Sequence, residues 1–141
     1  MRRIRWIAGF IFGFGPPLAR AETSFHSGPT QVALLELFTS EGCSSCPPAE
    51  QWLAGYRDRP ELWREVVPVA WHVNYWNHLG WKDVYSSKYF TAREYAYASY
   101  WRTNSVYTPC FVRNGQEWHR DTHSISSPMA GGELKADWND H

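Results

Sequence analysis

The chain has 141 residues, which is enough for one domain with a modest hydrophobic core. Its 14 Lys and Arg balance its 14 Asp and Glu without forming a basic stripe, so neither a nucleic acid nor an anionic membrane surface is indicated as a partner. Nine Trp, eight Tyr and seven Phe are present, so aromatic rings must supply much of the buried area or line a binding surface.

The first 21 residues are typical of a secretory signal peptide. A basic start with three arginines is followed by an apolar run at 6–14, and residues 19–21 read Ala-Arg-Ala, an A-x-A cleavage site. The apolar run is roughly half of the 20 residues that a membrane-spanning helix needs. We therefore expect a periplasmic or secreted protein with no stable membrane span after cleavage, whose domain, 22–141, carries ten positive and fourteen negative charges.

Residues 32–38 are a near-continuous apolar run interrupted only by Glu36, which predicts a strand buried on both faces. A turn-forming stretch follows, and then the C-x-x-C pair of Cys43 and Cys46. The two prolines after Cys46 fit the first turn of a helix that extends to about residue 56. A second buried strand at 66–73 completes a strand–helix–strand crossover.

Further elements follow an aromatic, glycine-containing loop at 74–85. A helix is predicted over 87–101 with Ser87 as its N-cap. Strands at 110–113 and 116–120 flank Asn114-Gly115, which indicates a two-residue hairpin. The predicted fold class is α/β, with a central mixed sheet flanked by helices and a core at about 32–120. Residues 121–141 are expected to form an irregular or incomplete extension that contains a possible strand at 133–138.

The C-x-x-C pair carries the predicted chemistry. A cysteine between a buried strand and a helix lies where unpaired N–H groups and the helix dipole favour a thiolate, so Cys43 is the expected nucleophile. Cys46, one turn further on and more shielded, would resolve the mixed disulfide. The hypothesis is a thiol-disulfide oxidoreductase with no cofactor beyond its own Cys43–Cys46 disulfide, acting on extracytoplasmic proteins that contain thiols or disulfides.

Three residues are expected to assist the pair. Thr108-Pro109 precedes the hairpin, and in a thioredoxin-type arrangement a cis-proline there brings backbone beside the nucleophilic sulfur and pairs with an extended substrate. Glu36 lies seven residues before Cys43, where a buried carboxylate could relay the proton of Cys46. The alternative is that Glu36 points to an edge or pairs with an arginine.

Rings and imidazoles gather after the second strand, where ligands bind in open α/β sheets. His72, Trp76 and Trp81 are candidate substrate-binding residues, although a core or surface histidine and packing tryptophans are the alternatives. Cys110 has no obvious partner. It is either a small buried hydrophobe or, with Cys43, Cys46 and His72, part of a site for zinc or copper.

Three separated motifs carry a family resemblance: ELFTSEGCSSCPPAE at 36–50, HVNYWNHLGWKD at 72–83, and VYTP at 106–109 with the following Asn-Gly. Together they resemble the secreted bacterial thioredoxin-like family catalogued as domain of unknown function 1223. The resemblance implies a thioredoxin-like fold and a redox role. It also implies a C-terminally shortened member, since the family usually continues well beyond this length. Asn74 and Cys110 depart from the family, which has Asp and Gln there.

Two other functions remain open. One is a metal-binding or metal-delivery module that uses Cys43, Cys46 and His72. The other is a non-enzymatic binding domain in which the Cys43–Cys46 bond is only a local staple. So short a closed loop removes little entropy from the unfolded chain, which argues against a purely structural role.

Overall fold

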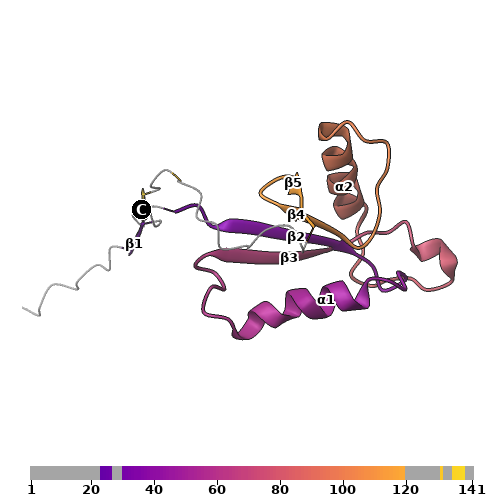
Figure 1. Ribbon diagram of the computed structural model, residues 1–141, viewed down its shortest axis with the longest axis horizontal. Helices are drawn as coiled ribbons and strands as arrows, with labels where there is room; N and C mark the ends of the chain where they lie inside the picture. Colours follow the sequence, from indigo (N-terminus) through magenta and orange to yellow (C-terminus); the bar gives the residue numbers. More distant parts are fainter. Residues whose placement is uncertain (1–22, 27–29, 120–130, 132–134, 139–141) are drawn as a thin grey trace, which may run out of the picture.

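The computed structural model describes residues 23–26, 30–119, 131 and 135–138 (Figure 1). The predicted signal peptide, 1–21, lies outside the described residues. The elements, in chain order, are β1 Thr23–His26, β2 Ala33–Thr39, α1 Pro47–Ala54, the 3-10 helix η1 Gly55–Asp58, β3 Val66–His72, the 3-10 helix η2 Asn77–Leu79, α2 Lys88–Tyr100, β4 Cys110–Arg113, β5 Gln116–Glu117 and β6 Lys135–Trp138.

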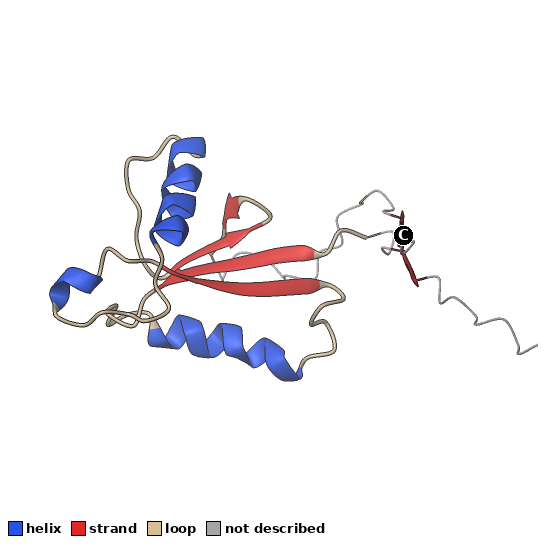
Figure 2. Cartoon of the chain, turned by 180° about the vertical axis from the view of Figure 1, so that it is seen from behind, coloured by secondary structure: helices blue, strands red, loops and turns tan. Residues whose placement is uncertain are grey.

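A mixed sheet of four strands, in the order β3-β2-β4-β5, forms the centre of the fold. β2 is parallel to β3, with Leu37 opposite Ala70, and antiparallel to β4, with Leu37 opposite Phe111. Helix α1 connects β2 to β3 across one face of this sheet, and α2 lies on the other face (Figures 1 and 2). The predicted crossover and the α/β class with a mixed, helix-flanked sheet are confirmed.

Alternate residues of β2 point into two separate hydrophobic clusters, as the pleat of a strand requires. Leu35 and Leu37 belong to the cluster under α1, together with Leu53 and Tyr56 of the α1–η1 segment. Phe38 belongs to the cluster on the opposite face, where Val73, Cys110, Val112 and the partly buried Tyr97 and Trp101 pack. Both faces of β2 are therefore covered, as its apolar sequence predicts.

Aromatic rings fill much of the α1 face. The ring of Trp52 lies 5.5 Å from Tyr56, 5.2 Å from Phe111 and 5.6 Å from Trp118, measured between ring centroids. Two of these contacts are edge-to-face, the geometry that the charge distribution of aromatic rings favours. The high aromatic content thus supplies buried area in this half of the core.

Two local predictions are confirmed, and one strand is shorter than predicted. The Ser87 side chain accepts a hydrogen bond from the Tyr89 N–H and caps α2. Asn114 and Gly115 have φ of 49° and 82°, the left-handed conformation of a two-residue hairpin turn. β5 ends at Glu117 instead of residue 120, because Trp118 turns into the core and is 7% exposed.

A separate two-stranded sheet joins the ends of the described chain. β1 pairs antiparallel with β6, and His26 lies opposite Lys135. β6 falls within the possible strand predicted at 133–138, of which residues 133 and 134 lie outside the described part, as does most of the expected 121–141 extension. The sequence did not predict strand β1. No helix among the described residues is long and apolar enough to cross a membrane.

Candidate functional site

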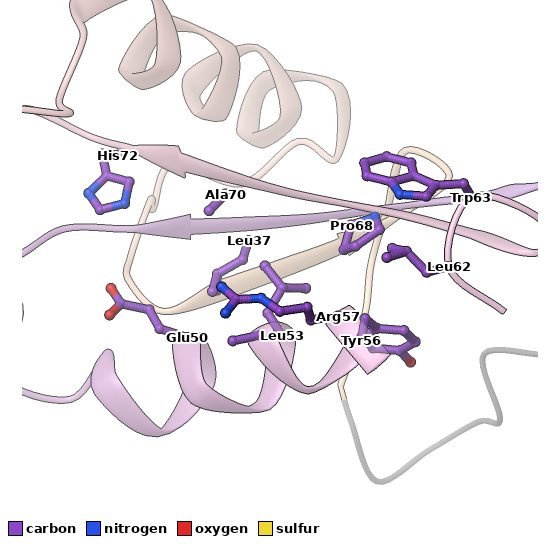
Figure 3. A pocket seen from close by; sticks show the side chains of 11 residues that line it. Leu37, Glu50, Leu53, Tyr56, Arg57, Leu62, Trp63, Pro68, Ala70 and His72 are labelled. Atoms are coloured by element: carbon purple, nitrogen blue, oxygen red, sulfur yellow. The ribbon is translucent and has the colours of Figure 1, made fainter. Parts of the chain in front are cut away.

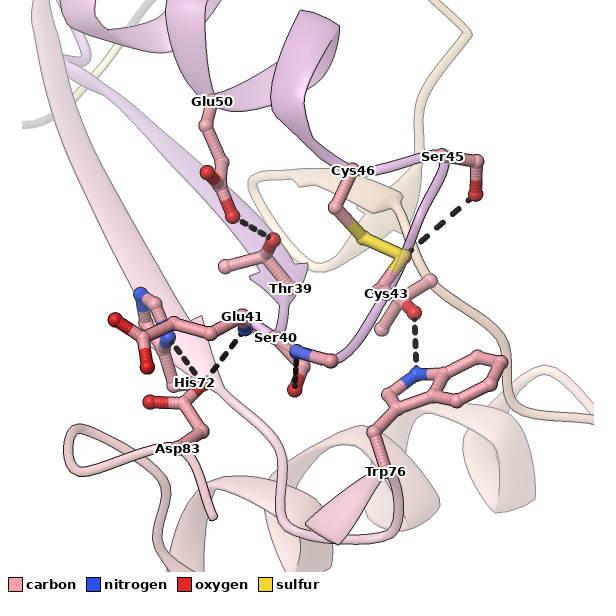
Figure 4. Close-up of a disulfide and its surroundings, with 12 residues drawn as sticks. Thr39, Ser40, Glu41, Cys43, Ser45, Cys46, Glu50, His72, Trp76 and Asp83 are labelled. Atoms are coloured by element: carbon pink, nitrogen blue, oxygen red, sulfur yellow. Dashed lines mark hydrogen bonds and ion pairs between the residues drawn. A yellow bond between two sulfur atoms is a disulfide. The ribbon is translucent and has the colours of Figure 1, made fainter. Parts of the chain in front are cut away.

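The C-x-x-C pair forms a disulfide between the carboxyl end of β2 and the start of α1 (Figure 4). The two sulfurs are 2.12 Å apart and the Cα atoms 5.4 Å apart. The pair lies just before the first helix, as predicted, and Cys46 occupies the N-cap because α1 starts at Pro47. Cys43 lies one turn earlier, with its carbonyl accepting from the Cys46 N–H at 3.2 Å.

Few backbone donors remain for a thiolate at this helix start. Pro47 and Pro48 have no N–H, and the N–H groups of Ala49 and Glu50 donate to the Cys46 carbonyl at 2.9 and 3.1 Å. The hydroxyl oxygen of Ser45 lies 3.6 Å from the Cys43 sulfur. Ser45, which the sequence did not single out, is therefore the hydroxyl placed to donate to a Cys43 thiolate.

The two sulfurs are similarly shielded. Cys43 is 2% exposed and Cys46 is 0% exposed, so the expected contrast between an accessible and a shielded cysteine is small in the disulfide form. An incoming thiol reaches Cys43 only when a neighbouring group moves. The contacts around Cys43 therefore decide how easily the disulfide is opened.

Glu36 is fully buried, but its contacts lead away from the cysteines. Its carboxylate accepts hydrogen bonds from Arg93 Nε at 2.6 Å, Trp71 Nε1 at 2.8 Å and the Tyr97 hydroxyl at 2.5 Å. These partners belong to the α2 side of the sheet, whereas α1 and its neighbours Leu35 and Leu37 lie on the other face. The contacts correspond to the alternative in which Glu36 pairs with an arginine.

A different carboxylate, Glu50, lies on the α1 face. It is four residues after Cys46, a spacing that places side chains on the same side of a helix. The Thr39 hydroxyl, buried at the end of β2, donates to Glu50 Oε1 at 2.5 Å (Figure 4). The spacing from Cys46 was the signal that could have identified Glu50 in the sequence.

Asp83, missed in the sequence, anchors the turn before Cys43. Its Oδ2 accepts from the Glu41 N–H at 2.9 Å and from His72 Nδ1 at 2.7 Å, and its Oδ1 accepts from the Tyr85 N–H. Burial alone would raise the pKa of Asp83, but these hydrogen bonds and the His72 charge together lower it below its ordinary value. Asp83 thus ties the loop after β3 to the turn that leads into the disulfide.

His72 is held by this carboxylate and does not reach the sulfurs. It ends β3, opposite Thr39 in the sheet register. Figure 4 shows His72 on the other side of the segment 39–41 from the disulfide. The structure therefore gives His72 a role in ordering that segment through Asp83.

Trp76 and Thr108, two of the predicted substrate-binding residues, are brought together beside Cys43. Trp76 Nε1 donates to Thr108 Oγ1 at 2.7 Å (Figure 4). The Thr108-Pro109 peptide bond is cis and immediately precedes β4. On the other side Trp76 packs on Gly42, because a Cβ placed on Gly42 would lie 3.0 Å from the Trp76 Cβ.

Gly42→Ala is expected to destabilise the protein by about 1–3 kcal/mol, because the added methyl group overpacks against Trp76. Thermal unfolding followed by circular dichroism measures the change. The matched control is Gly55→Ala at the end of α1. Its added Cβ meets nothing within 4 Å and its φ is −62°, so we expect this variant to be neutral or stabilised by about 0.4–1 kcal/mol. Equal effects at both glycines would contradict the packing described.

The loop after β3 carries exposed apolar side chains, and one of them, Trp81, contacts the turn that leads into Cys43. Leu79, Trp81, Val84 and Tyr85 are between 60% and 77% exposed, and Trp81 Nε1 donates to Glu41 Oε2 at 2.8 Å. Within this loop, Asp83 binds Asn77 and Tyr85 through hydrogen bonds. Large exposed apolar groups on a hydrogen-bonded loop offer a surface for contact with another polypeptide.

A cavity of about 480 Å³ lies between α1 and β3 (Figure 3). Its walls are mainly apolar, and Glu50 and His72 lie at one end while Trp63 and Tyr56 lie at the other. No feature of the sequence indicated it. The lining residues are Leu37, Glu50, Leu53, Ala54, Tyr56, Arg57, Leu62, Trp63, Pro68, Ala70 and His72.

Cys110 is buried on the α2 face at the start of β4, and it lies opposite Phe38 of the neighbouring strand β2. Burial raises the pKa of its thiol to about 12, so the thiol stays protonated at neutral pH. Within the described part of the chain, no group of three or more His, Cys, Asp or Glu side chains is arranged to hold a metal ion. The packing of Cys110 with Phe38, Val73 and Val112 fits the small buried hydrophobe of the two predicted alternatives.

Residues 34–131 match the family described as "Protein of unknown function (DUF1223)", and the chain belongs to that family. It is also similar to the X-ray crystal structure of protein AGR_C_4864 from Agrobacterium tumefaciens, with 44% sequence identity and a TM-score of 0.53. That match covers 58% of this chain and 35% of the Agrobacterium protein, so the chain spans about a third of its length. No curated protein matches the sequence.

Proposed function

We propose that this protein is a thioredoxin-like thiol-disulfide oxidoreductase that uses Cys43 as nucleophile and Cys46 as resolving thiol. The observation that carries the proposal is the disulfide itself, which joins two cysteines spaced as C-x-x-C at the junction of a central strand and a helix. The signal-like segment at 1–21 supports a periplasmic or secreted setting, in which disulfides form and persist.

The order of elements supports the thioredoxin-like assignment. β2, α1 and β3 form a parallel crossover unit, α2 covers the opposite face, and the β4–β5 hairpin adds antiparallel to β2. The Thr108-Pro109 pair enters β4 beside the turn that carries the cysteines. This arrangement brings the C-x-x-C turn and the Thr-Pro segment to one end of the sheet.

The exchange proceeds in two balanced steps. In the reduced protein the Cys43 thiolate attacks one sulfur of a partner disulfide, so that a mixed disulfide forms and the other partner sulfur leaves as a thiolate and takes up a proton. The Cys46 thiolate then attacks the Cys43 sulfur, which releases the second partner thiol and closes the Cys43–Cys46 bond. Two electrons pass to the partner, and the reverse sequence oxidises a partner dithiol.

Side chains near the pair have distinct roles in this proposal. The Ser45 hydroxyl donates to the Cys43 thiolate and stabilises it. Glu50, four residues after Cys46 and hydrogen-bonded to Thr39, exchanges the Cys46 proton in this proposal and takes the role expected of Glu36. The exposed loop around Trp81 and the backbone at Thr108-Pro109 receive the polypeptide partner.

Capture of a mixed disulfide tests the proposal. In Cys46→Ser the resolving thiol is absent, so we expect a stable 1:1 adduct with glutathione when glutathione disulfide is added, detected by intact mass. Cys43→Ser is the matched control, since it loses the same disulfide but keeps a buried Cys46 and should give little adduct. Equal capture by both variants, or by neither, would reject the assigned roles.

A further inference from the structure

The cavity between α1 and β3 is a feature that the proposed exchange chemistry leaves without a role. Its volume of about 480 Å³ lies within the range of about 300–1,000 Å³ that small-molecule sites occupy. Three small side chains in its walls, Ala54, Pro68 and Ala70, leave this space between the helix and the sheet (Figure 3). Because protein interiors are packed about as densely as organic crystals, a space of this size beside the core is available to a ligand.

Arg57 supplies an unpartnered positive charge to this cavity. It lies in η1, directly after α1, and no hydrogen bond or ion pair holds its guanidinium among the described residues. Figure 3 shows its side chain between the two ends of the cavity. The lining holds one carboxylate, Glu50, which accepts a hydrogen bond from the Thr39 hydroxyl at 2.5 Å. The guanidinium is therefore free to bind an anion, and its fork of N–H donors matches a carboxylate.

Trp63 stands at one end of the cavity in an unusual backbone conformation. Its side chain is 67% exposed, and its φ of 65° is a left-handed value that bulky residues rarely adopt. The turn holds it there through the Trp63 N–H, which donates to the Val66 carbonyl at 2.9 Å. So exposed a ring adds little to the core, and strained positions of this kind cluster at ligand-binding sites. The ring offers a flat apolar surface to a ligand in the cavity.

The walls select the class of ligand. Leucines on both sides of the cavity favour an apolar body, and Arg57 favours a negative charge. A second negative charge would meet Glu50 and the Asp83 carboxylate, which lies 2.7 Å from the His72 ring at the same end. The lining holds no lysine and no second arginine to balance it. A molecule with one carboxylate and an apolar body therefore fits better than a doubly charged phosphate ester.

We propose that the cavity between α1 and β3 binds a small amphipathic carboxylate, whose apolar body lies against Leu53, Leu62 and Pro68 and whose carboxylate pairs with Arg57. Trp63 packs on the apolar body at the end of the cavity. The inference goes beyond the proposed function, because neither Cys43 nor Cys46 lines the cavity and no bond is made or broken there.

Isothermal titration calorimetry with octanoate, kept below the concentration at which it forms micelles, tests the proposal. The matched ligand is 1-octanol, which has the same chain but no charge. We expect octanoate to bind with a stoichiometry of one and about tenfold more tightly than 1-octanol, the gain from a hydrogen-bonded charge. Equal affinities would mean that the cavity takes any apolar group, such as a side chain of a polypeptide, and would overturn the proposal. Absence of octanoate binding would also overturn it.

Arg57→Met removes the charge but keeps an apolar side chain over the cavity. The affinity for octanoate should fall about tenfold, and the affinity for 1-octanol should not change. Arg64→Met is the matched control, because Arg64 is exposed in the turn before β3 and does not line the cavity. Equal losses in the two variants would indicate general attraction between charges and would reject the assigned site.

Ala70→Leu fills the cavity from β3, and it should abolish the binding of both ligands. Ala96→Leu makes the same change at an exposed position of α2, outside the lining, and should bind both ligands as the wild-type protein does. Binding retained in Ala70→Leu would place the ligand elsewhere on the protein and overturn the proposal.

Trp63→Gly keeps the test decisive if Ala70→Leu folds poorly. Glycine adopts positive φ without strain, so the melting temperature should be retained. Loss of the aromatic contact should weaken the binding of both ligands about fivefold. Unchanged binding in a folded Trp63→Gly protein would contradict the placement of the ligand.

Discussion

Replacing Cys43 with serine is expected to reduce thiol-disulfide exchange by more than about 100-fold, to the rate of the uncatalysed reaction. A serine hydroxyl has no thiolate form and cannot attack a disulfide sulfur, and the remaining thiol of Cys46 is buried at the N-cap of α1. The exchange rate with an oxidised peptide substrate measures the loss.

The fold should survive this substitution. The loop closed by Cys43 and Cys46 spans only three steps of sequence, so the chain-entropy model gives the disulfide about 2 kcal/mol of stabilisation. Cys46→Ser loses the same bond and serves as the control for stability. We expect the two variants to unfold at similar temperatures but to differ in mixed-disulfide capture. Full exchange activity in Cys43→Ser would contradict the assignment of the nucleophile.

Arg93→Met is expected to lower the free energy of unfolding by about 3 kcal/mol. The guanidinium lies 2.6 Å from the Glu36 carboxylate, which is fully buried at the centre of the sheet. Removing the cation leaves a buried charge with only the neutral donors of Trp71 and Tyr97, and breaking a buried ion pair in this way typically costs 3–5 kcal/mol. We expect a cost at the low end of this range because the Arg93 side chain is 40% exposed. Denaturant unfolding measures the cost.

Two comparisons separate this structural role from catalysis. Arg64→Met, at an exposed arginine of the turn before β3, should change stability by no more than about 0.5 kcal/mol. Glu36→Gln should retain exchange activity in its folded fraction, because the contacts of Glu36 lead to α2 and not to the cysteines. A folded Glu36→Gln protein that has lost exchange would restore the proton-relay interpretation.

The elements that depend on local sequence were the ones that could be predicted. The apolar runs of β2 and β3, the Ser87 cap and the Asn114-Gly115 turn each determine backbone conformation within a few residues. β1 could not be found in this way, since its four residues have no apolar alternation and its partner β6 lies at the other end of the chain.

The positions of the cysteine pair before a helix and of the Thr-Pro pair before a hairpin could be predicted because both are local signals. The side-chain partners were not, because they come from distant segments: Arg93 is 57 residues from Glu36. The alternation of β2 could have placed Glu36 on the face opposite Leu37, but the sequence did not show which face α1 covers. Glu94, which is buried on α2, could not be identified from the sequence as an inward-facing acid. The helix carries aromatic residues on more than one side and therefore has no single apolar stripe.

The reduction potential of the Cys43–Cys46 couple tests the central claim most directly. The protein is equilibrated with glutathione buffers, alkylated and weighed by mass spectrometry. A redox-active pair should give a value between about −270 and −120 mV, the range of known exchange proteins. A value below about −300 mV would identify a structural disulfide and contradict the proposed function.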